Sequence, residues 1–579
     1  MQSNTMPDDG DDYRIGYVAD VEGHWDYFLE YVQRSKVLDW EEHYDNLSSR
    51  VTNGSGITFQ RLKLRPNTHF VYGGDSVDKG PGDIRLCRAL VGLKKRYPDR
   101  VHLLVGNRDL NKIRFSSELS DEDMERPIEV IERPFWDPKA LSFKEHLEEI
   151  KQTHAANDDD DTLDHFNTKA ERLRWMLKHT LGCPDTFEFR REEISYLEQI
   201  YGCYPPNSDT HESIPVPNDR SRDKDVIHGD TTEVTDEDVV NSFEYEINHP
   251  EGSLRQYLHH SSVAAVIGNT IFVHGAIDRL TMRFVPSKHS KFELPTSTPP
   301  SFAEPSIEIT DGTMIENVHE WVESLNQYLH DGLKDFETRP HWNKERTSRG
   351  GEALLAIQNR PSMWGRSVVC NSYADGGVVA TDDAEEQRQE ALRVAEQELN
   401  PLAFEGIASN VFDQAPADWL LAHGIKRIVV GHKPTGDCPA VLSSAYTGVE
   451  VCAVDTSFAR RRDISTDDKS NRFGVNRGDA IALVEIAGRD RHNNCLEISG
   501  TLADGTEYSN THPHIGDKNN KSGDSILGKR TVDGWWVKAS VSPGSYHLCR
   551  GYGRTVEYDT RSKEDIVVCH QLQKAMASS

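Results

Sequence analysis

Short apolar runs, each bounded by glycine or polar residues, recur along the first part of the chain. The runs RIGYVAD (14–20), THFVYGGD (68–75) and VHLLVGN (101–107) are rich in aromatic and branched residues, which predicts β-strands. Amphipathic stretches at 28–38 and 84–98 separate them. An alternation of strand, loop and helix is typical of an α/β sheet, whose ligand-binding loops lie at the carboxyl ends of the strands.

The pattern changes after about residue 115. Long, charged segments such as SFKEHLEEIKQTH (142–154) and KAERLRWMLKH (169–179) favour helix, which predicts a largely helical insertion. Strand signals resume at 261–275 and return at 425–436, 448–459 and 479–488, after which the chain is strand-rich and punctuated by glycine.

These patterns predict a division of the chain into seven segments. They are a disordered tail (1–12), the first half of an α/β core (13–114), a helical insertion (115–256), a core strand with His274 (257–284), a loop and helical insertion (285–400), the second half of the core (401–490) and a β-rich C-terminal extension (491–579).

Length and charge limit the classes of function. A chain of 579 residues exceeds one compact core, so we expect one large domain with insertions, or two domains. The net charge of -29 argues against a nucleic-acid backbone or an anionic membrane as the main partner. The sequence has no membrane-length apolar run and no C-x-x-C pair among its 9 cysteines. We therefore expect a cytoplasmic protein with free thiols.

Acidic, amide and imidazole residues follow predicted strands five times, each beside a glycine. Glycine permits the sharp turn that aims a side chain into the crevice beyond a strand end. The candidate residues are Asp20 and Glu22, then Asp75 and Asp78, then Asn107, Arg108 and Asp109, then His274, and last His432. Any one of these motifs alone is weak, whereas their joint order is hard to obtain by chance.

In these residues the sequence resembles the calcineurin-like metallophosphoesterases, which include the phosphoprotein phosphatases and the diadenosine tetraphosphate hydrolases. The family pattern is D-x-H-G, G-D-x-x-D-R-G, G-N-H-D/E, then H-G or H-A, then G-H. The resemblance covers the chain to about Leu110 and two windows around His274 and His432. It implies an α/β fold of the metallophosphoesterase type, a β-sandwich flanked by helices.

The resemblance also implies two metal ions that share Asp75. One ion takes Asp20, Glu22 and Asp75, and the other takes Asp75, Asn107, His274 and His432. Carboxylates and an amide suit hard cations and imidazole suits transition metals, so manganese is the first expectation and magnesium, iron or zinc are alternatives.

Two residues depart from the family pattern. Glu22 stands where the family has a histidine, which makes the first site all-oxygen; His24 is the spare imidazole nearby. Arg108 stands where the family has the histidine thought to protonate the leaving group, and arginine keeps its proton. Arg108 can instead clamp a phosphate, and we expect Asp78 and Asp109 to orient it.

The expected activity is hydrolysis of a phosphomonoester or a phosphoanhydride by water activated between two metals. Lys79 replaces the family's phosphate-binding arginine and supplies a point charge. Without a histidine acid, substrates whose leaving group needs little protonation are favoured, such as a phosphoanhydride or an aryl phosphate. The expected substrate is either a phosphorylated small molecule or a phosphoprotein. The alternative is a catalytically impaired binding or scaffold protein, because Glu22 and Arg108 both depart from the pattern. The sequence does not indicate the oligomeric state.

Overall fold

The computed structural model describes most of the chain, with gaps. The described residues are 13–44, 57–134, 140–154, 163–201, 204, 214–217, 233–275, 277, 282–288, 312–356, 414–432, 435–443, 448–456, 480–512, 526–529, 531, 533, 535–552 and 555–568. The predicted tail at 1–12 lies outside the described residues, as does most of the segment at 285–400.

The larger of two central sheets has seven strands in the order β17-β16-β15-β1-β4-β5-β7. Strands β1, β4, β5 and β7 run parallel, while β15 pairs antiparallel with β1 and continues into β16 and β17. The bounds are β1 (Tyr13–Val18), β4 (Thr68–Tyr72), β5 (Val101–Leu104), β7 (Ser261–Ser262), β15 (Ile481–Gly488), β16 (Asn494–Thr501) and β17 (Glu507–His512). The predicted boundary at 490 thus falls between two paired strands, and the central sheet runs on to His512.

The second central sheet has five strands in the order β13-β14-β12-β9-β8. Its middle strands β9, β12 and β14 are parallel. The bounds are β8 (Ala264–Ile267), β9 (Thr270–Val273), β12 (Arg427–Val430), β13 (Ala440–Ser443) and β14 (Glu450–Ala453). Residues almost 160 positions apart therefore lie on adjacent strands.

The two central sheets pack face to face. Tyr17 of β1, Phe272 of β9 and Val429 of β12 belong to one buried cluster, and the rings of Tyr17 and Phe272 stack with centroids 5.8 Å apart. Other residues of the two sheets, such as Tyr72 of β4 and Ile428 of β12, point the other way into a second cluster beneath the helices. Strands β9 and β12 and most of β1 are buried on both faces, which is why these strands read as continuous apolar runs. The expectation of a mixed α/β fold is confirmed.

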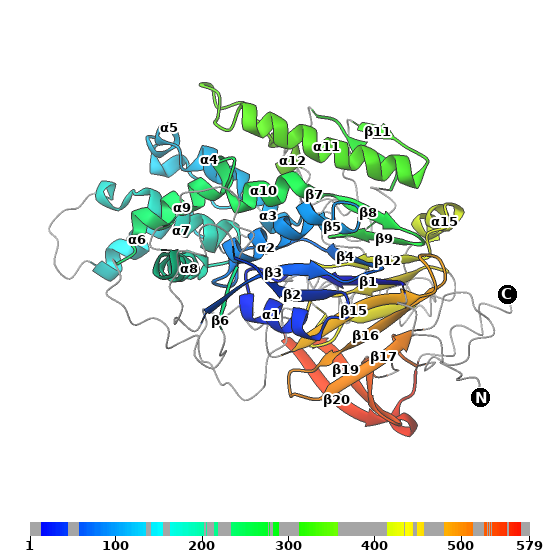
Figure 1. The fold of residues 1–579 in the computed structure, drawn as a ribbon. Helices are drawn as coiled ribbons and strands as arrows, with labels where there is room; N and C mark the ends of the chain where they lie inside the picture. The colour runs from blue at the N-terminus through cyan, green and yellow to red at the C-terminus, as the bar shows by residue number, and fades with distance from the viewer. Residues whose placement is uncertain are drawn as a thin grey trace, which may run out of the picture.

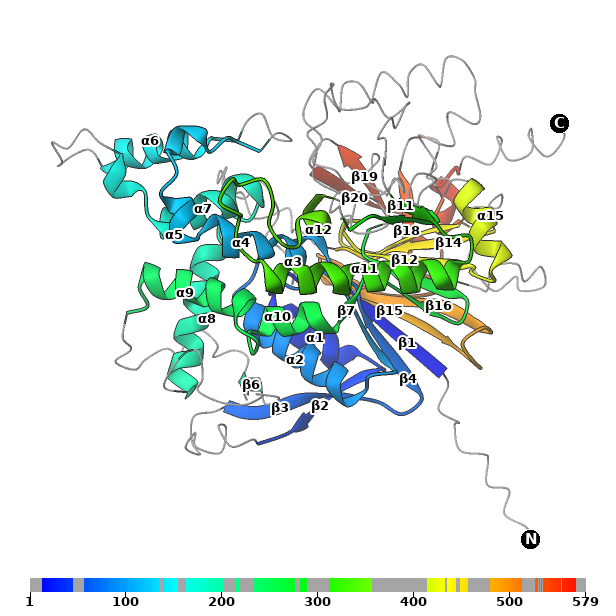
Figure 2. The ribbon, with the colours of Figure 1, turned by 90° about the horizontal axis from the view of Figure 1, so that it is seen from above.

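Helices cover the outer faces of both sheets (Figures 1 and 2). The helices near the seven-stranded sheet are α1 (Trp25–Arg34), α2 (Asp83–Arg96) and α10 (Ser253–His260), and those over the five-stranded sheet are α11 (Val318–Thr338) and α15 (Gln414–Ala422). Trp321 of α11 and Trp419 of α15 meet edge to face at 5.3 Å. Indole Nε1 of Trp321 donates to the carbonyl of Phe284, which satisfies its polar atom inside the core.

A mainly helical layer lies beside the central sheets. It contains α4 (Ile113–Glu118), α5 (Asp121–Met124), α6 (Phe143–His154), α7 (Lys169–Trp175), α8 (Thr186–Tyr201) and α9 (Asp236–Asn248), with the short α3 (Asn107–Asn111) leading into it and α12 (Glu352–Ala356) beside it. Figure 2 shows this layer to one side of the strands. A small sheet at its base joins β2 (Leu38–Glu42), β3 (Ile57–Leu64) and β6 (Ile214–Pro217).

Smaller sheets complete the described fold. Strands β10 (Phe284–Pro286) and β11 (Gly312–Met314) form a pair, and β18 (Trp536–Ser542), β19 (Ser545–Tyr552) and β20 (Thr555–Ser562) form a three-stranded sheet at the red end of the chain (Figure 1). No helix in the described ranges has the length and apolar character needed to cross a membrane. The described cysteines, Cys87, Cys183, Cys438, Cys452, Cys495 and Cys549, carry free thiols.

Candidate metal centre

Four of the predicted ligands sit on strained backbone directly after strands. Asp20 follows β1 and Asp75 follows β4, with φ values of 53° and 54°, while Glu22 has φ 52° and His432, after β12, has φ 65°. Residues other than glycine rarely adopt the left-handed region, and such strain gathers at functional sites. The repeated conformation aims side chains from both central sheets at one place.

The structure brings the predicted ligands into two overlapping groups. Ligand atoms of Asp20, Glu22 and Asp75 lie within 4.8 Å of one another, and so do those of Asp75, His274 and His432. Asp75 belongs to both groups and is buried, as are Asp20, Glu22 and His274. Each group can hold a metal ion, and the shared carboxylate stands between the two.

Glycines make this close approach possible. Gly74 has φ +91°, and a Cβ added there would lie 2.7 Å from the backbone nitrogen of Gly106 and 2.9 Å from Nδ1 of His274. Both distances are shorter than a side chain tolerates, so the loop after β4 and the loop after β5 can touch only without a side chain at this position.

His274 is oriented by its own hydrogen bonds. Its Nδ1 lies 2.7 Å from the carbonyl of Gly73, and its Nε2 lies 3.2 Å from Oδ1 of Asn107 and 3.4 Å from Oδ1 of Asp75. A carbonyl partner for Nδ1 leaves Nε2 as the atom that faces the site, the arrangement typical of metal-ligating histidine. Burial lowers the pKa of His274, but the Asp75 carboxylate outweighs burial and raises that pKa to about 10.

His432 joins the two sheets at the site. Its backbone nitrogen donates to both carboxylate oxygens of Asp20 at 2.9 Å, and its ring lies 5.1 Å from the ring of His274. One residue therefore offers an imidazole to the second group and fixes the carboxylate of the first.

Arg108 and Lys79 both contact Glu22. Nε of Arg108 lies 2.8 Å from Oε1 of Glu22, and Nζ of Lys79 lies 2.9 Å from Oε2. Nη1 of Arg108 donates to Oδ2 of Asp78 at 3.2 Å, as expected of an orienting acid, and its backbone nitrogen donates to Oδ1 of Asp75 at 2.8 Å. The two departures from the family pattern thus form an ion pair with each other.

The contacts of Asp109 correct its expected role. Its carboxylate accepts hydrogen bonds from the backbone nitrogens of Asp75, Ser76 and Gly106 at 2.9, 2.7 and 2.8 Å, and from Oγ of Ser76 at 2.6 Å. Asp109 is fully buried and holds the turns after β4 and β5 together. Of the two acids expected to orient Arg108, it is Asp78 that contacts the guanidinium group. Burial and the neighbouring Asp75 raise the pKa of Asp109 to about 6.

Lys112 is a site residue that sequence reasoning missed. Its buried Nζ lies 2.7 Å from Oδ1 and 2.8 Å from Oδ2 of Asp78, and donates to the carbonyl of Arg108 at 3.0 Å. The available signal was its spacing, four residues after Arg108 on a helical turn. His24, the proposed spare imidazole, stands half-buried at the N-cap of α1, and its catalytic role stays a prediction.

The helical layer contacts the site directly. The carbonyl of Leu181 accepts from Nη1 of Arg108 at 3.4 Å, and the hydroxyl of Thr186 donates to the carbonyl of Asp78. The carboxylate of Asp83 accepts from the backbone nitrogen of Asp78 at 3.1 Å and pairs with Arg190 of α8 at 3.2 Å. The loop that carries Asp78 and Lys79 is thus fixed from the insertion.

The C-terminal sheet fixes the loop on the other side. Nζ of Lys538 donates to the carbonyl of Thr435 at 2.7 Å, and Nε2 of His547 lies 2.8 Å from Oδ1 of Asp437. Thr435 and Asp437 lie a few residues after His432, so contacts from β18 and β19 hold the chain that follows this predicted ligand.

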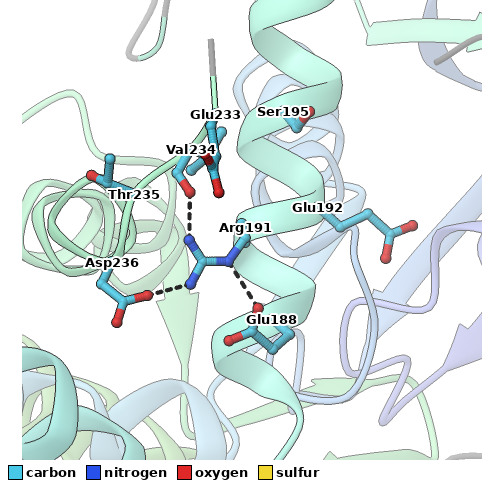
Figure 3. A pocket seen from close by; sticks show the side chains of 8 residues that line it. All are labelled: Glu188, Arg191, Glu192, Ser195, Glu233, Val234, Thr235 and Asp236. Atoms are coloured by element: carbon cyan, nitrogen blue, oxygen red, sulfur yellow. Dashed lines mark hydrogen bonds and ion pairs between the residues drawn. The ribbon is translucent and has the colours of Figure 1, made fainter. Parts of the chain in front are cut away.

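A separate cavity of about 680 Å³ lies between α8 and the start of α9 (Figure 3). Its lining consists of Glu188, Arg191, Glu192, Ser195, Glu233, Val234, Thr235 and Asp236. Arg191 occupies its middle and bonds Glu188, the carbonyl of Val234 and Asp236. The predicted metal ligands do not line this cavity.

Comparison with known proteins finds no family model that matches the chain. A segment of 48 residues is 42% identical to the serine/threonine-protein phosphatase PP2A-like PPG1 of Saccharomyces cerevisiae, and this match spans 8% of the chain and 13% of the yeast protein.

The solved structures that the chain matches include two phosphatases. One is a cold-active protein-tyrosine phosphatase of a psychrophilic Shewanella, with TM-score 0.31, 11% identity and coverage of 86% of this chain and 80% of the other. The second is a protein serine/threonine phosphatase from Saccharomyces cerevisiae, with TM-score 0.27, 10% identity and coverage of 88% and 82%.

Proposed function

We propose that this protein is a metal-dependent phosphoesterase that hydrolyses a phosphomonoester or a phosphoanhydride. The observation that carries the proposal is the position of Asp75, whose carboxylate belongs to both ligand groups. Two adjacent metal positions with a common carboxylate are the arrangement that phosphoryl hydrolysis uses. The short likeness to a serine/threonine phosphatase supports the same class of reaction.

The donor set fits divalent cations. Asp20, Glu22 and Asp75 bring three buried carboxylates together, which is costly unless positive charge compensates them. That group has oxygen donors alone and suits manganese or magnesium, whereas His274 and His432 make the second group suitable for manganese, iron or zinc. Bound ions would supply Lewis-acid polarisation of the phosphoryl group and activation of the attacking water.

Arg108 is the residue we assign to the substrate phosphate. Its contacts among the described residues use Nε and Nη1, so Nη2 is the guanidinium atom left to meet a phosphoryl oxygen. Because arginine holds its proton, Arg108 stabilises charge in the transition state without protonating the leaving group. Substrates that leave as stable anions, such as phosphoanhydrides and aryl phosphates, therefore suit this site best.

The test is turnover by metal-stripped protein re-supplied with manganese or magnesium. The panel is p-nitrophenyl phosphate, a dinucleoside polyphosphate and a phosphoserine peptide, and the matched variant is Asp75→Asn, which keeps the size of the side chain and removes the charge. We expect metal-dependent hydrolysis that is lost in the variant. Full activity in Asp75→Asn, or full activity without metal, would reject the proposal.

A second candidate is a binding or scaffold protein with little activity. The observation that favours it is the double contact of Glu22 with Arg108 and Lys79, which neutralises the carboxylate without a metal. Calorimetric titration with manganese, together with the turnover assay, distinguishes the phosphoesterase from the scaffold protein. Stoichiometric metal binding with no hydrolysis of any panel member supports the scaffold.

A further inference from the structure

Three arginines from separate elements surround one carboxylate in the helical layer. Asp123 of α5 lies 3.6 Å from Nη1 of Arg126 and 3.6 Å from Nη1 of Arg172 of α7, and it also contacts Arg346 in the loop after α11. We call Arg126, Arg172 and Arg346 the arginine cluster. One carboxylate leaves two positive charges of this cluster uncompensated.

Arg172 is the buried member of the arginine cluster. It is 2% exposed, and its Nε and Nη2 make no hydrogen bond within the described part of the chain. Its guanidinium lies 4.2 Å from the ring centroid of Phe143, which stacks on its face but cannot accept these in-plane donors. A buried guanidinium with unsatisfied donors is costly, and an anion that accepted from them would remove that cost.

The charges of the neighbouring Arg114 and Arg349 are balanced by carboxylates and do not add to this positive excess. Arg114 bonds Glu118 at 2.9 and 2.8 Å, and Arg349 bonds Glu118 at 3.1 Å and Glu352 at 2.7 Å. The local charge excess therefore belongs to the arginine cluster. Burial lowers the pKa of Arg172 to about 10, and the charge of Arg126 acts in the same direction against the opposing effect of Glu118.

The other two arginines give the arginine cluster access to solvent. Side chains of Arg126 and Arg346 are 25% and 32% exposed, above the buried Arg172. Arg346 has φ 52°, a strained conformation, and its side chain contacts Asp123 of α5. Three guanidinium groups near one point can donate to the several oxygens of a tetrahedral oxyanion, which accepts paired hydrogen bonds from a guanidinium fork.

We propose that the arginine cluster binds a phosphate group, at a site separate from the candidate metal centre. The residues of the two sites do not overlap, so this proposal stands whether or not the chain hydrolyses phosphoesters. In a protein with a net charge of -29, a local positive excess is needed to hold such an anion.

The experiment titrates the full-length, metal-free protein with inorganic phosphate by calorimetry and by thermal unfolding. We expect saturable binding that raises the unfolding temperature, and a fall in affinity of roughly tenfold or more in Arg126→Gln and in Arg346→Gln. Both residues are partly exposed, so each variant should fold, which circular dichroism without phosphate verifies. Phosphoserine as a second probe, against serine, separates a phosphorylated side chain from free phosphate as the source of the group.

Two control variants make the outcome specific. Arg133→Gln removes an exposed arginine that pairs with Glu145 in the same layer, and Arg339→Gln removes an exposed arginine that pairs with Asp335 at the end of α11. Both should bind phosphate as the unmodified protein does. No saturable binding, binding that survives Arg126→Gln and Arg346→Gln, or an equal loss of binding in Arg133→Gln or Arg339→Gln would each overturn the proposal.

Discussion

Glu22 and Arg108 form an ion pair of 2.8 Å, and each occupies a position where the metallophosphoesterase pattern has histidine. A carboxylate in place of one imidazole adds a negative charge, and a guanidinium in place of the other adds a positive charge. The two departures therefore compensate each other in charge, and Arg108 also contacts Asp78 on its far side. Their effects on any activity should be coupled and not additive.

The first prediction concerns the leaving group. Arg108→His restores a side chain that can donate a proton, so hydrolysis of an alkyl phosphate should rise relative to hydrolysis of a phosphoanhydride, by about tenfold or more. The measurement is the ratio of kcat/KM values for the two substrates, with Arg114→His as a control outside the site. An unchanged ratio in Arg108→His would contradict the role given to Arg108.

A second prediction concerns metal stoichiometry. Because Asp75 belongs to both ligand groups whereas His432 belongs to one, His432→Ala should reduce manganese binding from two ions to one, and Asp75→Asn should weaken both sites. Calorimetry on metal-stripped protein measures the stoichiometry directly. Loss of a single ion in Asp75→Asn, with the other bound at full affinity, would show that the carboxylate is not shared.

A third prediction concerns Asp83 and pH. Burial raises the pKa of Asp83 from its usual 3.8 to about 7, although Arg190 acts in the opposite direction. The folded protein then binds this proton more tightly than the unfolded chain, so its contribution to the free energy of unfolding decreases as pH rises from about 4 to about 7. The largest slope that one proton allows is about 1.4 kcal/mol per pH unit.

Urea unfolding of metal-free protein across that range checks the sign. In Asp83→Asn this part of the pH dependence should be absent, and the exposed Asp39→Asn should behave as the unmodified protein. A free energy of unfolding that increases with pH by the same amount in both Asp83→Asn and the unmodified protein would exclude the effect.

A fourth prediction concerns the C-terminal sheet. Lys538→Met removes the bond to the carbonyl of Thr435 and loosens the loop after His432, so affinity at the histidine-containing group should fall by about tenfold. The group without histidine should keep its affinity, which distinguishes loss of this contact from general unfolding. Lys563→Met, an exposed change beyond β20, serves as the control.

A fifth prediction concerns Asp109. Asp109→Asn replaces one acceptor oxygen by a donor that faces backbone nitrogens of the same polarity, so the free energy of unfolding should fall by about 1–3 kcal/mol. Denaturant titration measures the change, and Asp121→Asn on the exposed side of α5 is the matched control. Equal stability of the two variants would argue against the backbone role of Asp109.

The order of polar residues after strands was enough to predict which side chains meet. Asp20 and Asp75 follow a parallel pair of strands in one sheet, His274 and His432 follow a parallel pair in the other, and the carboxyl ends of parallel strands lie at one edge of a sheet. Local pattern therefore carries this part of the site. The role of these residues as metal ligands stays a prediction.

Contacts between distant segments were decided by tertiary structure alone. The pair between Arg190 and Asp83, the bond from Lys538 to Thr435 and the backbone bonds of Asp109 depend on how helices and sheets pack against one another. Each joins positions that are far apart in the sequence, and burial, which turns such charges into structural pairs, is a property of the packed fold. The chain by itself thus determined the strand ends and their ligand types, and packing determined which charges surround them.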